Sequence, residues 1–199
     1  MINSISHERL AQLTMELVRR ESEAPPGNEE AVCTYIKDFL QQQGLTVTEQ
    51  PCAPHRANVL ATIPGKDSQA LPYLYVGHVD VVPAGNSALW TTPPYEPAVR
   101  EGRIYGRGAA DMKGGLMASV MAVRLLKDAG ISIPGDVMIT SVCDEEGGGN
   151  GSIQAVMRGL LADGVINCEP TDGKLILAHM GWVFFQVNFE GKACHSGEK

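Results

Sequence analysis

The prediction of the fold starts from the stretch Tyr75–Gly85, "YVGHVDVVPAG". It overlaps the apolar run Leu71–Val76, which is typical of a buried strand. His78 and Asp80 follow directly, two residues apart, so a strand-like backbone would place both side chains on the same side. In open parallel sheets the ligand crevice lies beyond the carboxyl ends of the strands. We therefore expect His78 and Asp80 to face a functional site.

Two amphipathic helices are expected before this strand. Ser6 can cap the first, which has leucines at helical spacing at positions 10, 13 and 17. Asn28 is placed to cap the second, and Gly44 to end it. The apolar residues of this second helix fall on one face: Val32, Tyr35, Ile36, Phe39 and Leu40.

Short apolar runs and helical patterns then alternate along the chain. We expect strands at 58–63, 71–76, 135–143 and 165–169, two more within 174–191, and a hairpin turning at Glu101-Gly102. Helical patterns cover 112–130 and 151–164. Strands that alternate with helices predict an α/β fold with a mainly parallel central sheet and helices on both faces.

The composition excludes several classes of protein. The chain has 199 residues, of which 44% are hydrophobic, and a net charge of -7 without a basic cluster, so we expect no nucleic-acid partner. Neither a bilayer-spanning run nor a signal-peptide core is present, so we expect no membrane association and a cytoplasmic location. The cysteines are odd in number and lack a C-x-x-C pair, which favours reduced thiols: Cys33, Cys52, Cys143, Cys168 and Cys194.

Acidic residues stand at the ends of the other expected strands and helices. Asp111 lies in "GRGAADMKGG", the run Asp144-Glu145-Glu146 follows "VMITSVC", and Glu169 lies in "NCEPTDG". One histidine with several carboxylates suits Zn²⁺, Co²⁺ or Mn²⁺. We therefore predict a metal site at this edge of the sheet.

Each of these residues also has a structural explanation. A histidine after a strand can be a hydrogen-bonded core residue, Asp111 can be a helix N-cap, and adjacent acids can form a solvated loop. The glycine-rich stretches "GRGAAD" and "GGGNG" match neither phosphate-binding pattern. Cys194 beside His195 is not a nucleophile with its base, because adjacent residues in an extended chain point apart. The joint occurrence of the acids at strand ends favours the metal site.

Four motifs in this order carry a resemblance to a known family: "GHVDVVP", "GRGAADMKGG", "DEEGGGNG" and "CEPT". The chain resembles the M20 family of co-catalytic zinc aminoacylases and carboxypeptidases. That family includes acetylornithine deacetylase, succinyl-diaminopimelate desuccinylase and glutamate carboxypeptidase. The stretches "GRGAADMKGG" and "WTTPPYEP" are most similar to its deacetylase and desuccinylase branch.

The resemblance implies a role for each of the polar residues. His78 and Glu169 resemble ligands of a first metal ion, Asp111 resembles a carboxylate that bridges two metals, and Glu146 resembles a ligand of the second. Glu145 resembles the general base that takes a proton from the attacking water. Asp80 resembles the carboxylate that orients the histidine ring by accepting its other N–H.

The resemblance also implies a domain boundary near the end of the chain. Residues 1–190 would be the N-terminal part of the catalytic domain, and 191–199 the start of a lid and dimerisation domain. His195 resembles a histidine that reaches a partner subunit's active site and stabilises the oxyanion. We expect the rest of the lid and the last second-site histidine to lie beyond Lys199, so that the 199-residue chain alone hydrolyses weakly or not at all.

The expected function is metal-dependent hydrolysis of an amide bond in an N-acyl amino acid or small peptide. Two Zn²⁺ per full-length subunit are implied, with Co²⁺ or Mn²⁺ as substitutes, in a homodimer. A di- or carboxypeptidase of the same family is one alternative. A non-catalytic metal-binding or interaction domain is another, if the chain is naturally complete.

Overall fold

The fold is known from a computed structural model, which describes residues 6–67, 69–178, 180–181, 183, 185, 187–188 and 190–191. Its helices are α1 (His7–Val18), α2 (Glu30–Gln42), α3 (Gly114–Asp128) and α4 (Asn150–Met157), with short turns η2 (Ser87–Leu89) and η3 (Ala109–Lys113). Its strands are β1 (Thr46–Ala53), β2 (Arg56–Ile63), β3 (Tyr73–His78), β4 (Ala98–Arg100), β5 (Arg103–Tyr105), β6 (Val137–Val142) and β7 (Gly164–Asn167).

Five of the strands form one central sheet in the order β1-β2-β6-β3-β7. Strands β6, β3 and β7 are parallel to one another, and the β1–β2 hairpin continues the sheet antiparallel at one edge. His78, the last residue of β3, is the register partner of Val142, the last residue of β6. The chain segments that follow these two strands therefore leave the sheet side by side.

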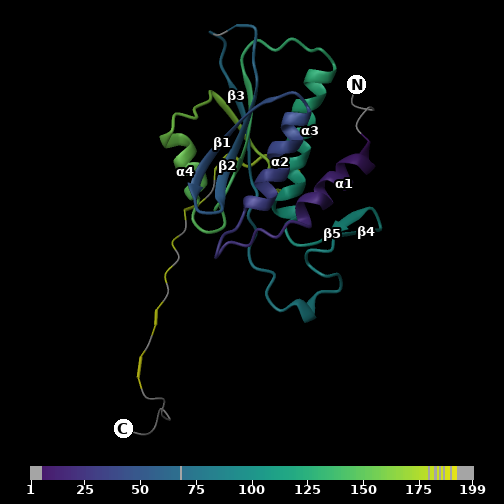
Figure 1. The fold of residues 1–199 in the computed structure, drawn as a ribbon, viewed down its shortest axis with the longest axis vertical. Coiled ribbons are helices and arrows are strands. Elements are labelled where there is room, and N and C mark those ends of the chain that lie inside the picture. The colour runs from purple at the N-terminus through teal and green to yellow at the C-terminus, as the bar shows by residue number, and fades with distance from the viewer. Residues whose placement is uncertain are drawn as a thin grey trace.

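Helices cover both faces of this sheet, as Figure 1 shows. Helices α2 and α3 pack on one face, where α1 joins them, and α4 packs on the other face against β1, β2 and β6. The core between α1, α2, α3 and the sheet is aliphatic, and Leu17, Ile36, Leu116 and Ile139 are among its most buried members. The α/β class with a mainly parallel sheet and helices on both faces is confirmed.

The first two helices begin and end close to the expected residues, with one difference. The Ser6 hydroxyl accepts a hydrogen bond from the Arg9 amide at 3.2 Å, as expected of an N-cap. The prediction that Asn28 caps the second helix is wrong. Glu29 occupies that position and makes no capping bond, because its side chain turns into the core to meet Arg56.

Two strand predictions also need correction. Strand β1 was not expected, because "TVTEQPCA" has little apolar periodicity and the strand lies exposed at the sheet edge. The two strands expected within 174–191 are wrong for the described residues of that range, which form no strand. Several of their apolar side chains are largely exposed, including Leu175, Leu177 and Phe185. These residues lead away from the body in Figure 1, where no described strand pairs with them.

Two further expectations concern residues near the chain end and the cysteines. The expected lid segment 191–199 lies outside the described residues except for Gly191. Cys33, Cys52, Cys143 and Cys168 are free thiols, whereas Cys194 is among the residues that are not described. Among the helices of the described ranges, none has both the length and the apolar character that crossing a bilayer requires.

A buried lysine joins α1 to the turn that precedes α3. Lys113 is fully buried, and its ammonium group donates hydrogen bonds of 3.0 Å and 2.9 Å to the main-chain oxygens of Leu17 and Arg20. These oxygens lie at the end of α1, where helical carbonyls lack partners. Burial lowers the pKa of Lys113 to about 7, although the charge of Asp80 acts in the opposite direction.

We predict that Lys113 makes the stability of the chain depend on pH. Between its folded pKa of about 7 and its ordinary value of 10.5, unfolding takes up a proton, so this group makes the chain more stable as the pH rises. The contribution is about 1.4 kcal/mol per pH unit. Urea denaturation of wild type and Lys113→Met at about pH 7.5 and pH 9.5 measures it. In the variant, the free energy of unfolding should lack this dependence on pH. An equal change with pH in both proteins would contradict the prediction.

Candidate metal centre

His78 provides the only nitrogen ligand of the site among the described residues. It is the last residue of β3 and is buried, so the strand fixes its backbone. Its Nδ1 lies 2.9 Å from the main-chain oxygen of Asp80. Because a carbonyl oxygen only accepts, Nδ1 must carry a proton, and Nε2 is the nitrogen that faces the crevice and can become a ligand atom once the ring is neutral.

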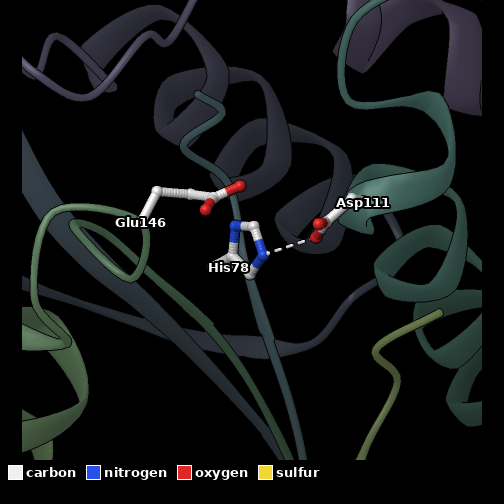
Figure 2. A group of neighbouring side chains, drawn as sticks. All are labelled: His78, Asp111 and Glu146. Atoms are coloured by element: carbon white, nitrogen blue, oxygen red, sulfur yellow. Dashed lines mark hydrogen bonds and ion pairs between the residues drawn. The ribbon is translucent and has the colours of Figure 1, made fainter. Parts of the chain in front are cut away.

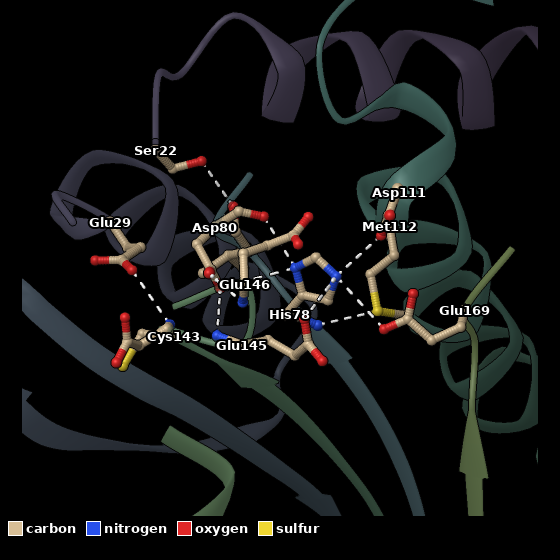
Figure 3. A network of polar contacts seen from close by, with 12 residues as sticks. Ser22, Glu29, His78, Asp80, Asp111, Met112, Cys143, Glu145, Glu146 and Glu169 are labelled. Carbon is tan, nitrogen blue, oxygen red and sulfur yellow. Dashed lines mark hydrogen bonds and ion pairs between the residues drawn. The ribbon is translucent and has the colours of Figure 1, made fainter. Parts of the chain in front are cut away.

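Two carboxylates from distant parts of the chain meet this nitrogen. The Nε2 atom of His78 lies 3.1 Å from Oδ1 of Asp111, in η3, and 3.4 Å from Oε1 of Glu169, which follows β7. Figure 2 shows the contact with Asp111, and Figure 3 shows both. The structure therefore brings together the three residues that the sequence predicts for a first metal ion.

Close backbone packing carries Glu169 to this point. A side chain at Gly115, in the first turn of α3, would place its Cβ 2.1 Å from the main-chain oxygen of Cys168. Only glycine allows this approach between the start of α3 and the segment after β7. Gly115, the second glycine of "MKGG", thus contributes to the position of Glu169.

Asp80 acts differently from the expectation for its carboxylate. The imidazole N–H goes to its main-chain oxygen, and Oδ1 of Asp80 lies 3.7 Å from Nδ1 of His78. Its two carboxylate oxygens instead accept hydrogen bonds from the amides of Glu145 and Glu146, at 3.1 Å and 3.0 Å. Asp80 is fully buried and contacts His78 on one side. Its carboxylate also holds the main chain of the loop that contains Asp144, Glu145 and Glu146, called the acidic loop below.

Glu145 and Glu146 both reach the crevice from the loop after β6. Oxygens of Asp111 and Glu146 and a nitrogen of His78 all lie within 4.8 Å of one another. The same holds for His78, Glu145 and Glu169. His78 thus belongs to two groups of possible metal ligands, one with Asp111 and Glu146 and one with Glu145 and Glu169.

The acidic side chains raise one another's affinity for protons. Burial raises the pKa of Glu145, with repulsion from Glu169, Asp80 and Asp111 adding to it. Burial likewise raises the pKa of Glu146, and Asp111 adds to this effect. Burial alone would lower the pKa of His78, but the hydrogen bond and charge of Glu169, together with the charge of Asp80, raise it to about 9.

The donor set fits a divalent metal ion. Five carboxylates and one imidazole share a small volume, and that excess of negative charge favours a bound cation. Imidazole nitrogen with carboxylate oxygens is the ligand chemistry of Zn²⁺ and similar ions. His195, the remaining predicted site residue, lies outside the described residues.

Two residues near the site had no signal in the sequence. Glu29, which is buried, and Arg56, which is partly buried, form an ion pair and contact Asp144, the first residue of the acidic loop. Glu29 stands in the turn-like stretch "PPGNEE" and Arg56 at the start of a strand, 27 residues later. No local pattern marks a partnership over that distance.

Sequence comparisons match the chain to known proteins. The model of "Peptidase family M20/M25/M40" matches residues 74–192. A probable succinyl-diaminopimelate desuccinylase of Staphylococcus aureus is 36% identical over 197 residues, which cover 98% of this chain and 48% of the relative. N-formyl-4-amino-5-aminomethyl-2-methylpyrimidine deformylase of Bacillus subtilis is 35% identical over 83% of this chain and 39% of its own length. The chain thus spans about half the length of relatives such as the desuccinylase.

Solved structures with a similar fold include two peptidases. An M20 family metallo-carboxypeptidase of Sulfolobus solfataricus superposes with a TM-score of 0.70 at 25% identity, over 82% of this chain and 37% of its own. Human carnosine dipeptidase 1 gives the same TM-score and identity over 80% of this chain and 38% of its own. The residues that the family model matches, 74–192, include those of the candidate centre.

We predict that the chain binds a divalent metal ion through His78 and releases a proton on doing so. With a pKa of about 9, the imidazole is protonated at neutral pH and must lose its proton to become a ligand, so affinity rises as the pH approaches 9. Zinc calorimetry near pH 7.5 in two buffers of different ionisation enthalpy should show release of about one proton.

His55 offers a matched control for this experiment. It is an exposed histidine that pairs with Glu30 at 2.7 Å, away from the centre. His78→Ala should remove the tight zinc site, whereas His55→Ala should leave zinc affinity and proton release unchanged. Equal loss in both variants would show that the zinc is bound unspecifically.

Proposed function

Since the chain belongs to peptidase family M20/M25/M40, we propose that its protein is a metal-dependent amidohydrolase that cleaves an amide bond in an N-acyl amino acid or a small peptide. The observation that carries this proposal is the convergence of Asp111 and Glu169 on Nε2 of His78, with Glu145 beside them. The names of similar proteins, a desuccinylase, a deformylase, a carboxypeptidase and a dipeptidase, support hydrolysis.

The residues of the centre divide into two sets of ligands in this proposal. His78 and Glu169 would hold one ion, Glu146 would contribute to a second, and Asp111 would bridge the two. We assign Zn²⁺ to both positions, with Co²⁺ or Mn²⁺ as substitutes, because imidazole and carboxylate ligands suit these ions. When bound, such ions polarise the scissile carbonyl and lower the pKa of an attacking water.

Glu145 is the proposed general base. Its Oε2 lies 4.0 Å from Nε2 of His78, and its own amide is held by Asp80, so the carboxylate is directed at the crevice. Its raised pKa brings it closer to the pH at which a base can take a proton and later return it. Glu145 would accept the proton of the attacking water and pass it to the leaving amine, which then departs uncharged.

A cavity of about 650 Å³ next to these carboxylates is the proposed substrate site. Asp111, Glu145 and Glu169 line one part of it, and Thr171 and Lys174 line another. Cavities of this size accommodate small molecules. A substrate amide would lie over the carboxylates, and its remaining groups would extend along the segment after β7.

The proposal extends to the parts of the protein that the structure does not describe. By resemblance, residues 1–190 belong to the catalytic domain and 191–199 begin a lid and dimerisation domain, in which His195 stabilises the oxyanion in a partner subunit. A homodimer located in the cytoplasm is consistent with this assignment. The product of the complete open reading frame is the protein in which these points are tested.

We predict opposite effects for the two neighbouring glutamates. In the product of the complete open reading frame, Glu145→Gln should lower kcat by at least about a thousandfold and leave metal content unchanged, because a general base need not be a ligand. Glu146→Gln should reduce metal content. Metal analysis of both purified variants and assays on N-acetyl and N-succinyl amino acids and dipeptides measure this.

The same assays identify the substrate class and can refute the proposal. Preference for acyl amino acids over dipeptides would indicate a deacylase, and the reverse would indicate a peptidase. If Glu145→Gln lost metal and Glu146→Gln kept it, the two roles would be reversed. Metal binding without hydrolysis of any of these amides would contradict the proposed function and favour a non-catalytic metal-binding domain.

A further inference from the structure

Glu29, directly before α2, forms an ion pair with Arg56, the first residue of β2, whose side chain is partly buried. Glu29 is fully buried, and its carboxylate accepts hydrogen bonds from Nε of Arg56 at 2.8 Å and from Nη2 at 2.5 Å. Two parallel bonds of this kind fix both the distance and the orientation of a guanidinium group. The close approach of Arg56 to Gly27 leaves no room there for a side chain.

This pair contacts the acidic loop through both of its members. Nη2 of Arg56 lies 2.6 Å from Oδ1 of Asp144, and Oε1 of Glu29 accepts a hydrogen bond from the Asp144 amide at 3.3 Å. Asp144 has a φ of 59°, in the left-handed region that residues with a side chain rarely adopt. The loop therefore begins with a residue in a left-handed conformation, and both members of the ion pair contact that residue.

Three consecutive amides of the loop are bound by two buried carboxylates. Glu29 holds the amide of Asp144, and Asp80 holds those of Glu145 and Glu146. Figure 3 shows Glu29 beside the loop on the side away from His78, and Asp80 between the loop and the histidine. Two buried carboxylates thus fix the main chain at the start of the loop.

We propose that Glu29 and Arg56 are positioning residues for the metal centre: they set the turn at Asp144 from which Glu145 and Glu146 reach His78. Neither residue lines the cavity beside the carboxylates, so we assign their effect to the loop. The inference rests on the proposed function, because it takes Glu145 as the base and Glu146 as a ligand. Both members of the pair contact Asp144, and this distinguishes them from a pair that only joins α2 to β2.

The proposal is tested with three variants of the cluster, at Glu29, Asp144 and Arg56, and one control. Glu29→Gln removes the buried charge, and Asp144→Asn removes the charge that pairs with Arg56 from the loop side. Glu49→Gln is the control, since it removes an exposed ion pair between α2 and β1, with Lys37 at 2.7 Å. Arg56→Lys keeps the charge without the paired bonds.

Hydrogen exchange in the metal-free chain gives the first readout. In Glu29→Gln and Asp144→Asn the amides of residues 144–146 should exchange at least about tenfold faster than in wild type, while amides of β6 keep their protection. Glu49→Gln should exchange like wild type. Wild-type exchange at 144–146 in both Glu29→Gln and Asp144→Asn would overturn the proposal, and Asp144→Asn decides it alone if Glu29→Gln does not fold.

Metal affinity and kinetics in the product of the complete open reading frame give the second readout. Loss of a partner behind a metal ligand typically costs about ten- to a hundredfold in affinity or activity. We expect that loss in kcat and in the affinity for the second metal equivalent, with KM and the first equivalent within about threefold of wild type. Arg56→Lys should lose less kcat than Glu29→Gln, because it keeps the charge of the pair.

The two readouts separate failure of this inference from failure of the proposed function. If wild type binds metal and hydrolyses amides but the cluster variants match it in both, the positioning role is wrong and the function stands. If wild type neither binds metal nor hydrolyses amides, the proposed function is wrong, and the exchange rates still show whether Glu29 and Arg56 hold the loop.

Discussion

The parallel pairing of β3 with β6 is the constraint on which the rest of the site depends. His78 and Val142 are register partners at the ends of these strands, and the amide of Val79 continues the pairing by donating to the Val142 oxygen at 3.0 Å. The histidine and the acidic loop therefore leave the sheet at the same point. Had the two strands been antiparallel, their ends would lie at opposite edges and the cluster could not form.

Buried carboxylates then orient the groups that the strands bring together. Asp80 is fully enclosed, yet both of its oxygens bind loop amides and its main-chain oxygen binds the histidine ring. A buried charge is tolerated when hydrogen bonds replace its lost hydration. Glu29 follows the same rule with Arg56. The site thus depends on polar groups that orient the candidate metal ligands and are not assigned as metal ligands themselves.

The electrostatics of the centre favour a bound cation. Burial and neighbouring charges raise the pKa of Glu145 and of Glu146, and acidic neighbours outweigh burial at His78. Such an arrangement stabilises protons in the absence of other cations. A divalent ion would replace those protons and relieve the repulsion between carboxylates, which links metal binding to pH.

The sequence predicted the ligand residues better than their surroundings. His78, Asp111 and Glu169 were predicted to converge because each follows a strand or precedes a helix in a recognisable motif, and the structure brings them together. The Glu29–Arg56 pair was not predicted, because its contacts with Asp144 span 115 residues of sequence in one case and depend on tertiary packing.

Other differences arose where local pattern and tertiary context disagree. The main-chain oxygen of Asp80, rather than its carboxylate, receives the imidazole N–H, a choice that depends on a loop 65 residues away. The apolar run after Lys174 has the alternation of a strand, but strand formation needs a neighbour with which to pair. Sequence periodicity gives the residues that favour a strand and not the partner that completes it.

A crystal structure of the chain grown with zinc, with anomalous diffraction recorded at the zinc edge, tests the central claim most directly. The account predicts an anomalous peak about 2.0 to 2.2 Å from Nε2 of His78 and from carboxylate oxygens of Asp111 and Glu169. A zinc ion bound elsewhere, with these three side chains left in contact only with one another, would contradict it.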